Sequence, residues 1–214
     1  QVQQALAIKT AVTHWRGLKP HCMGTLYWQL NDTWPVCSWS SLDHGGGWKL
    51  LHHAARHFYA PVVVVAVPTT EGIDLRVVND RMDAVSVEIE ACAVSTEGEL
   101  RSLERTTLEA PADRAVSSLL IRSDALSDNE ILVYQWTVDG TQHSDHFAPR
   151  PYKAYPLIDA GIETQIAEHS DHVTLTLSAQ RLALFVAVEA NQPGRFRDTG
   201  FNLVPGHAVH LGFT

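Results

Sequence analysis

The sequence has few cysteines, and their spacing argues against a disulfide-stabilised protein. Its 214 residues include three cysteines, Cys22, Cys37 and Cys92, and no two of them form a CxxC pair. An odd, scattered set does not make a disulfide framework. We therefore expect free, buried thiols, and a single Cys22–Cys37 bridge is the alternative that the spacing leaves open.

Other features that the sequence lacks argue against a membrane-spanning, nucleic-acid-binding or nucleotide-binding protein. No apolar run approaches the roughly 20 residues of a membrane span, and the stretch Val62–Val67 is better interpreted as a strand. The formal net charge of −8 argues against non-specific binding to nucleic acid and against binding to an anionic membrane. The sequence also lacks a phosphate-binding glycine loop and a nucleotide fingerprint, so we expect no cofactor.

The first sixty residues follow a helical period. Apolar residues recur on one face of two predicted helices, Val2–Leu18 and Trp48–Tyr59. These faces consist of Ala5, Ile8, Val12 and Trp15 in the first helix, and Trp48, Leu51, Ala55 and Phe58 in the second. Between the helices, the apolar run Cys22–Leu30 predicts a buried strand, and Asn31–Gly47 predicts a polar, glycine-rich loop.

A helix, a strand, a loop and a helix make up one and a half units of an α/β barrel. The strand would need parallel neighbours that the sequence does not contain. We therefore expect residues 1–60 to be a piece of a (β/α)₈ barrel. Since the chain begins with Gln1 directly in a helix and without a signal-peptide pattern, we expect a part of a longer or processed protein, whose compartment stays open.

From Pro61 onward the period changes to two, which is typical of half-buried antiparallel strands. The predicted strands are Val62–Val67, Ile73–Val78, Val85–Cys92, Leu100–Leu108, Val116–Ile121, Ile131–Val138 and Gln142–Phe147. Asp139–Gly140 is a hairpin signal between the last two. Seven short strands at this spacing predict an immunoglobulin-like β-sandwich over residues 61–152.

A second, smaller β-sandwich unit is predicted over residues 153–214, after a Pro-rich linker or edge segment at 149–156. Its expected strands are Glu163–Ala167, Val173–Leu177, Leu182–Glu189 and Ala208–Phe213, and Gly200–Gly206 is expected to be a turn. The predicted fold class is therefore mostly β, with two immunoglobulin-like β-sandwich units preceded by an α/β fragment of a barrel.

Polar and aromatic side chains gather where the predicted barrel strand ends, at Trp28, Asn31, Asp32 and Trp34. Chemistry in α/β barrels occurs at that end of the strands. An indole can contact the apolar face of a sugar while amide and carboxylate groups bind its hydroxyls. We expect these four residues to bind substrate; core packing for the indoles, a turn role for Asn31 and a structural role for Asp32 are the alternatives. Trp39 is expected to pack the loop down.

Other reactive residues do not form a catalytic or metal-binding pattern. His53 and His57 are four apart on a predicted helix, but no glutamate completes an HExxH motif, so we expect no metal. The group of Ser38, Ser40, Ser41, Asp43 and His44 is too close in sequence to assume triad geometry. No glutamate precedes Glu71, so the barrel piece has no pair of glutamates for acid/base work, and we expect no catalytic residue in it.

Several of these motifs together resemble the β-mannosidases of glycoside hydrolase family 2. The matching segments are Met23–Asp32, Trp34–Pro35, Ser38–Ser41, Gly47–Lys49, His57–Pro61 and, near the C-terminus, Thr199–Gly206. The resemblance implies that residues 1–60 contain the last strand and helix of the catalytic barrel. It also implies that Trp28 lies in the sugar pocket, and that both catalytic glutamates lie on earlier strands.

The predicted function is that of the C-terminal part of a retaining, exo-acting β-mannosidase, which removes terminal non-reducing β-D-mannose from oligosaccharides. The partners implied are a mannose-containing oligosaccharide and the missing N-terminal part of the enzyme. The isolated chain is expected to be inactive and, with its strand and helices uncovered, to self-associate. The alternative is a stand-alone β-sandwich module that binds carbohydrate or another partner without catalysis.

Overall fold

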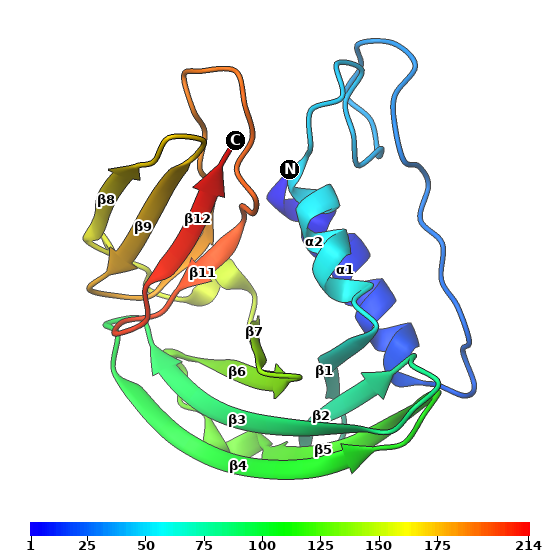
Figure 1. Ribbon diagram of the computed structural model, residues 1–214. Coiled ribbons are helices and arrows are strands. Elements are labelled where there is room, and N and C mark those ends of the chain that lie inside the picture. The colour runs from blue at the N-terminus through cyan, green and yellow to red at the C-terminus, as the bar shows by residue number, and fades with distance from the viewer. The chain divides into compact units, whose positions relative to one another are not determined.

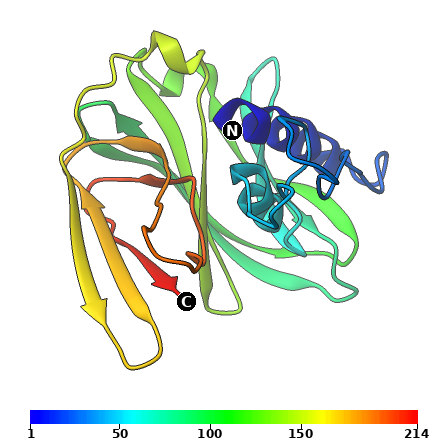
Figure 2. The ribbon, with the colours of Figure 1, turned by 90° about the horizontal axis from the view of Figure 1, so that it is seen from above.

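The computed structural model describes all residues 1–214, which form two compact units. The first unit comprises Gln1–Cys92, Ser102–Ser127 and Leu132–Phe147, and the second comprises Ala93–Arg101, Asp128–Ile131 and Ala148–Thr214. Figures 1 and 2 show the chain from two directions. The fold is mostly β, as predicted, and the three-domain division at residues 60 and 152 stays a prediction.

Two helices, α1 (Val2–Gly17) and α2 (Leu50–Phe58), lie side by side in the first unit (Figure 1). Their shared core consists of Val12, Leu51, Ala55 and Phe58, with Ala5 and Ile8 packed against it. Both predicted apolar faces are confirmed at these positions. Two predicted members are exceptions: the side chain of Trp15 is 45% exposed, and Trp48 lies before the first residue of α2 and outside this core.

Seven strands form the two sheets of an immunoglobulin-like sandwich. They are β1 (Val62–Pro68), β2 (Gly72–Asn79), β3 (Val85–Ser95), β4 (Leu100–Ala110), β5 (Arg114–Arg122), β6 (Glu130–Val138) and β7 (Thr141–Phe147). One sheet has the order β1-β2-β5 and the other β4-β3-β6-β7, so all seven predicted strands are confirmed. A short 3₁₀ helix, η1 (Ser123–Ala125), joins β5 to β6.

The hairpin between β6 and β7 also follows the prediction. Val138 pairs with Thr141, so the loop consists of Asp139 and Gly140. Both have positive φ, 49° and 74°. A two-residue loop with this twist matches the right-handed twist of the flanking strands, which is why Asp-Gly is favoured there.

Buried polar contacts join the helices to the sandwich. The guanidinium of Arg16 donates to the carbonyl oxygens of Phe58 and Ala60 and to the carboxylate of Asp80, the last at 2.7 Å. Burial works against ionisation of Asp80, but the hydrogen bond from Lys19 and the charge of Arg16 outweigh it and lower the pKa of Asp80. Gly17 is required at the end of α1, because a Cβ there would lie 2.9 Å from Val67 Cγ2.

The second unit contains two smaller antiparallel sheets. The strands β8 (Ile162–Glu168), β9 (Val173–Ala179) and β12 (Val209–Phe213) form one, in the order β12-β9-β8. The strands β10 (Ala183–Val186) and β11 (Phe201–Leu203) form the other. Leu175, Leu177, Ala179, Leu203 and Leu211 make up the core.

One prediction for this region is wrong in detail. Residues 200–206 were expected to be a turn, but Phe201–Leu203 is strand β11, because Leu203 is fully buried and outweighs the glycines on either side. The Pro-rich segment contains a 3₁₀ turn, η2 (Tyr152–Ala154), and the buried ring of Tyr155 fixes its end.

The predicted buried strand at Cys22–Leu30 is also wrong. The segment is extended but pairs with no strand, and Leu26 is 97% exposed. A strand cannot form a ladder or bury its side chains without neighbours, and the chain supplies none here. The cysteines are free, as expected, but they are not buried: Cys37 is exposed, and Cys22 and Cys92 are partly exposed. No helix is both long and apolar enough to span a bilayer.

Candidate functional site

The loop between the two helices folds back on the extended segment that leads into it. After α1 the chain returns alongside the helix to its N-terminal end (Figure 1). There the segment Ser40–Leu42 runs parallel to Gln29–Asp32. The amide of Ser41 donates to Gln29 O at 3.0 Å, Leu42 N donates to Leu30 O at 2.7 Å, and Asp32 N donates to Leu42 O at 3.3 Å. These bonds fix the backbone just after Trp28.

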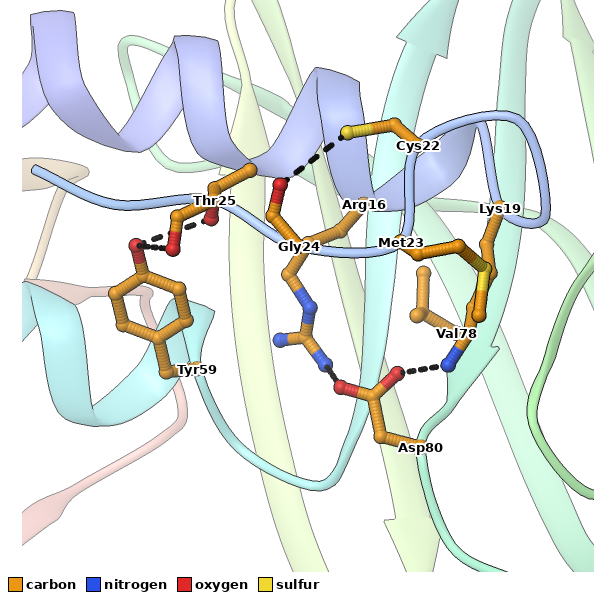
Figure 3. A pocket seen from close by; sticks show the side chains of 9 residues that line it. All are labelled: Arg16, Lys19, Cys22, Met23, Gly24, Thr25, Tyr59, Val78 and Asp80. Atoms are coloured by element: carbon orange, nitrogen blue, oxygen red, sulfur yellow. Dashed lines mark hydrogen bonds and ion pairs between the residues drawn. The ribbon is translucent and has the colours of Figure 1, made fainter.

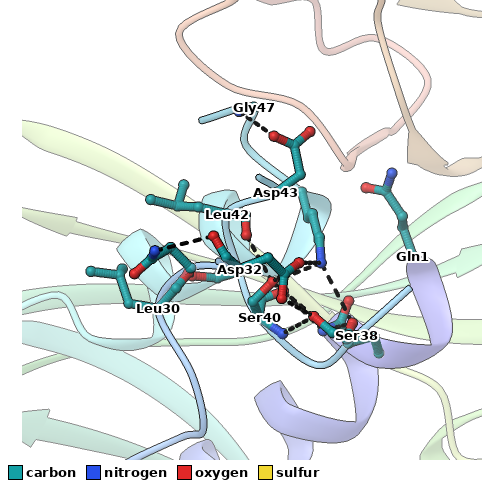
Figure 4. A network of polar contacts seen from close by, with 12 residues as sticks. Gln1, Leu30, Asp32, Ser38, Ser40, Leu42, Asp43 and Gly47 are labelled. Carbon is teal, nitrogen blue, oxygen red and sulfur yellow. Dashed lines mark hydrogen bonds and ion pairs between the residues drawn. The ribbon is translucent and has the colours of Figure 1, made fainter. Parts of the chain in front are cut away.

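A buried carboxylate is the centre of this loop. Asp32 is 6% exposed, and its two oxygens accept hydrogen bonds from the hydroxyls of Ser38 and Ser40 (Figure 4). The ammonium of Lys49 completes the group at 3.2 Å from Asp32 Oδ2 and 2.8 Å from Ser40 Oγ. The hydrogen bonds from Ser38 and Ser40, aided by Lys49, lower the pKa of Asp32. The carboxylate is therefore ionised at neutral pH.

A second polar group ties the same loop to α2. Ser41 is fully buried, and its hydroxyl lies 2.9 Å from Tyr27 Oη, 3.0 Å from Leu30 O and 3.0 Å from His52 Nδ1. Although Ser41 and His52 are in contact, the serine hydroxyl is enclosed by these partners and has no face open to a substrate. The structure therefore gives this pair a packing role and no nucleophilic one.

The predicted site residues lie on two sides of the loop. Trp28 and Trp34 are 73% and 65% exposed, and Asn31 is also exposed. Asp32, the next residue along, points inward to the buried serines and lysine. The prediction that Trp39 packs the loop down is wrong, since its ring is mostly exposed.

Sequence reasoning missed the partners of Asp32. Lys49 is 17 positions away, and only the return of the loop brings its ammonium to the carboxylate. The signals that could have found it were weak: a Ser-x-Ser pair, Ser38 and Ser40, and a lone lysine at the end of a glycine-rich loop. Two indoles and an amide on the exposed side can bind a ring with apolar faces and hydroxyl groups. A carboxylate enclosed by a cation and two hydroxyls is not free to transfer protons.

Two cavities lie elsewhere in the molecule. One of about 230 Å³ is found in the first unit, lined by Arg16, Lys19, Met23, Tyr59 and Asp80 among others (Figure 3). Its charged groups are paired with one another, at 2.7 Å for Arg16–Asp80 and 2.8 Å for Lys19–Asp80. No group of three or more His, Cys, Asp or Glu side chains is placed to hold a metal ion.

The other cavity, about 550 Å³, lies in the second unit and is mainly apolar. The residues lining it include Ile162, Ile166, Leu175, Val188 and Phe196. It has no convergent set of polar groups, which a specific small-molecule site normally carries. The part of the inter-helix loop at residues 28–49 is therefore the best candidate functional site.

Comparison with known proteins supports a single family. Residues 157–214 match the family model of an immunoglobulin-fold domain named for mannosidases. The chain is 31% identical to a β-mannosidase of Bos taurus over 94% of its own length, and 32% identical to one of Mus musculus over 95%. A β-mannosidase A of Aspergillus terreus is 28% identical over the whole chain. The chain spans about a quarter of the length of these curated relatives, 25% and 26%.

Solved structures extend the match to the fold. The β-D-mannosidase of Dictyoglomus thermophilum superposes with a TM-score of 0.85 at 25% identity, covering 98% of this chain and 26% of that one. The exo-chitosanase of Amycolatopsis orientalis has the same fold, with a TM-score of 0.73 at 16% identity over 98% of this chain and 30% of its own. The resemblance drawn from the motifs is therefore confirmed, and the chain matches, in sequence and in fold, about a quarter of a β-mannosidase of glycoside hydrolase family 2.

Proposed function

We propose that this chain is the C-terminal part of a retaining, exo-acting β-mannosidase, and that it supplies one wall of the sugar pocket together with two support domains. The observation that carries the proposal is the loop of residues 28–49. It presents Trp28, Asn31 and Trp34 to solvent from a backbone fixed by a buried network, in a chain that matches β-mannosidases over almost its whole length.

In this proposal Trp28 is the platform for the terminal mannose. Its ring is open on a large part of its surface, so the apolar face of a sugar can stack on it. Asn31 supplies an amide to a hydroxyl group, and Trp34 lies at the rim of the pocket. Asp32 contributes to the shape of the pocket through Ser38 and Ser40, because its oxygens are occupied by those hydroxyls.

The cleaving groups are proposed to come from the rest of the enzyme. A retaining glycosidase uses two carboxyl groups about 5–5.5 Å apart. The loop contains only two carboxylates, and both have structural partners: Asp32 binds Lys49 and the serines, and Asp43 accepts a hydrogen bond from the amide of Gly47 at 2.7 Å. The substrate is proposed to be a terminal, non-reducing β-D-mannose residue of an oligosaccharide.

Kinetics of the full-length enzyme test the proposal. In Trp28→Ala the stacking contribution, about 1 kcal/mol beyond area burial, is lost together with the buried area, so kcat/KM for an aryl β-mannoside should fall at least about tenfold. Trp39→Ala, a change of another exposed indole in the same loop, is the matched control and should stay within about twofold of wild type. An unchanged kcat/KM in Trp28→Ala, with a lowered melting temperature, would assign Trp28 to packing instead.

The isolated 214-residue chain gives a second test. It should not hydrolyse the same aryl β-mannoside, because the carboxylate pair is proposed to lie outside it. It should also self-associate, because Met23, Leu26, Leu30 and Trp34 are more than half exposed and exposed apolar surface favours association. Turnover that copurifies with the chain, or a monomer by light scattering at high concentration, would contradict the respective part of the proposal.

A further inference from the structure

Lys49 lies at the end of the loop, immediately before α2, and its ammonium is largely buried. Its side chain is 13% exposed. The three N–H groups of the ammonium have three acceptors: Ser40 Oγ at 2.8 Å, Asp32 Oδ2 at 3.2 Å and the carbonyl oxygen of Ser38 at 3.5 Å. All three acceptors belong to the loop, and Lys49 is the cation that compensates the buried charge of Asp32.

We propose that Lys49 is a positioning residue of the sugar pocket, acting through Asp32 and Ser40 on the segment that carries Trp28 and Asn31. This inference rests on the proposed function of the loop. Lys49 does not face the pocket, and we assign it no contact with substrate. Its effect reaches the pocket through the buried network of Figure 4.

The network around Asp32 has few protons to donate. Each serine hydroxyl has one proton to donate. Ser38 donates to one oxygen of Asp32, while the single proton of Ser40 is shared between the other oxygen of Asp32 and the carbonyl oxygen of Leu42, both at 2.7 Å; Lys49 is the charged donor to the carboxylate. If the ammonium is removed, an ionised carboxylate is left buried without its counter-charge. It must then bind a proton or move towards solvent.

Backbone hydrogen bonds connect the carboxylate to the exposed side chains. The backbone of Asp32 donates to Leu42 O, and the neighbouring Leu30 O and Gln29 O accept from Leu42 and Ser41. Movement of Asp32 therefore separates Gln29–Asp32 from Ser40–Leu42. These bonds fix the backbone on both sides of Asn31 and directly after Trp28. When they are lost, the distance between the Trp28 ring and the Asn31 amide is no longer fixed.

Lys49 lies outside the contacts that hold the rest of the first unit together. The core of the helix pair is formed by Val12, Leu51, Ala55 and Phe58, and Lys49 is not part of it. The helices also keep their polar contacts to the sandwich through Arg16. Loss of the Lys49 ammonium should therefore change the loop while the rest of the first unit stays folded.

The test uses the full-length enzyme with Lys49→Met, which keeps the length and apolar stem of the side chain but removes its charge. The readouts are KM and kcat for an aryl β-mannoside and the inhibition constant of free D-mannose. A displaced platform should raise both KM and the mannose inhibition constant about tenfold or more, since small misplacements of binding groups have effects of this size or larger. Partial unfolding would lower the apparent kcat and leave both constants unchanged.

Two further variants sharpen the result. Lys153→Met changes an exposed lysine in the second unit and should leave all three constants at the wild-type values. The double variant Lys49→Met with Asp32→Asn should raise the mannose inhibition constant no further than Lys49→Met alone, because the two residues act through one contact.

The outcomes distinguish the two proposals. A raised inhibition constant in Lys49→Met that the double variant does not increase supports the positioning role. An active wild type in which Lys49→Met has unchanged KM and inhibition constant overturns the positioning role and leaves the proposed function standing. A wild-type enzyme that does not hydrolyse the β-mannoside overturns the proposed function, and the positioning role with it.

Discussion

Arg16 offers the sharpest test of how the helix pair is joined to the first sandwich. Its side chain is 7% exposed, and the guanidinium supplies the hydrogen bonds that the carbonyl oxygens of Phe58 and Ala60 accept at the end of α2. Replacement by methionine, Arg16→Met, keeps the aliphatic volume and removes every donor. The change therefore isolates the polar contribution of this side chain.

The expected magnitude follows from those contacts. Hydrogen bonds to charged groups contribute about 1.5–3 kcal/mol each, and two carbonyl groups lose such a bond. The ion pair with Asp80 adds little, because that carboxylate is 43% exposed and keeps Lys19 as a partner. We therefore expect the free energy of unfolding of the first unit to fall by roughly 3–6 kcal/mol. This is a large part of the 5–15 kcal/mol that is typical of a domain.

Tryptophan fluorescence during urea unfolding measures this quantity for the first unit alone. All six tryptophans lie in that unit, so the second unit does not contribute to the tryptophan signal. The matched control is Arg122→Met, where an arginine that is 77% exposed pairs with an exposed Asp124; it should change stability by less than about 0.5 kcal/mol. If Arg16→Met and Arg122→Met unfold at the same urea concentration, the buried hydrogen bonds from Arg16 to the carbonyl oxygens of Phe58 and Ala60 do not stabilise the first unit.

The remaining predictions concern the core, the pH dependence and one turn. Leu51→Ala should lower the stability of the first unit by about 2–5 kcal/mol in the same urea assay, since Leu51 is fully buried between the helices. Burial, aided by the charge of Lys9 and opposed by Asp145, lowers the pKa of His146. The unfolded chain therefore binds more protons than the folded chain as pH falls below about 6.5. Stability should fall in that range, and His146→Gln should remove this part of the slope. Gly98→Ala should lower the melting temperature of the second unit by circular dichroism, because the residue has a φ of +97° and its Cβ would lie 2.7 Å from Pro205 Cγ; an unchanged melting temperature would contradict this.

Several strands of the first sandwich could be predicted because their sequences show which residues are buried. Val85, Val87 and Ile89 are buried and alternate with more exposed residues along β3, so no knowledge of the partner strand is needed. The helix faces carry the same kind of local signal. Trp15 shows the limit of this signal: helical spacing places the indole on the apolar face, yet its side chain is 45% exposed in the structure.

The features that sequence could not predict depend on partners distant in the chain. The run Cys22–Leu30 has the composition of a buried strand, but burial requires neighbouring strands that these 214 residues do not provide. In the candidate site, the aromatic and amide groups were visible as a cluster in the sequence. The contact of Asp32 with Lys49 was not, because it depends on the path of the loop between them.

The discontinuity of the second unit has a consequence for anyone who wishes to truncate or transplant it. The family model matches the continuous stretch 157–214, yet the compact unit also includes Ala93–Arg101 and Asp128–Ile131. The turn at Gly98 lies against Pro205 and Gln180. A Cβ added to Gly98 would lie 2.7 Å from Pro205 Cγ and 2.9 Å from Gln180 O. A gene cut near residue 150 would therefore produce a C-terminal piece lacking part of its own packing, and an N-terminal piece with an uncovered turn. A transferable form of the second unit would therefore have to include the β3–β4 hairpin in addition to the C-terminal residues.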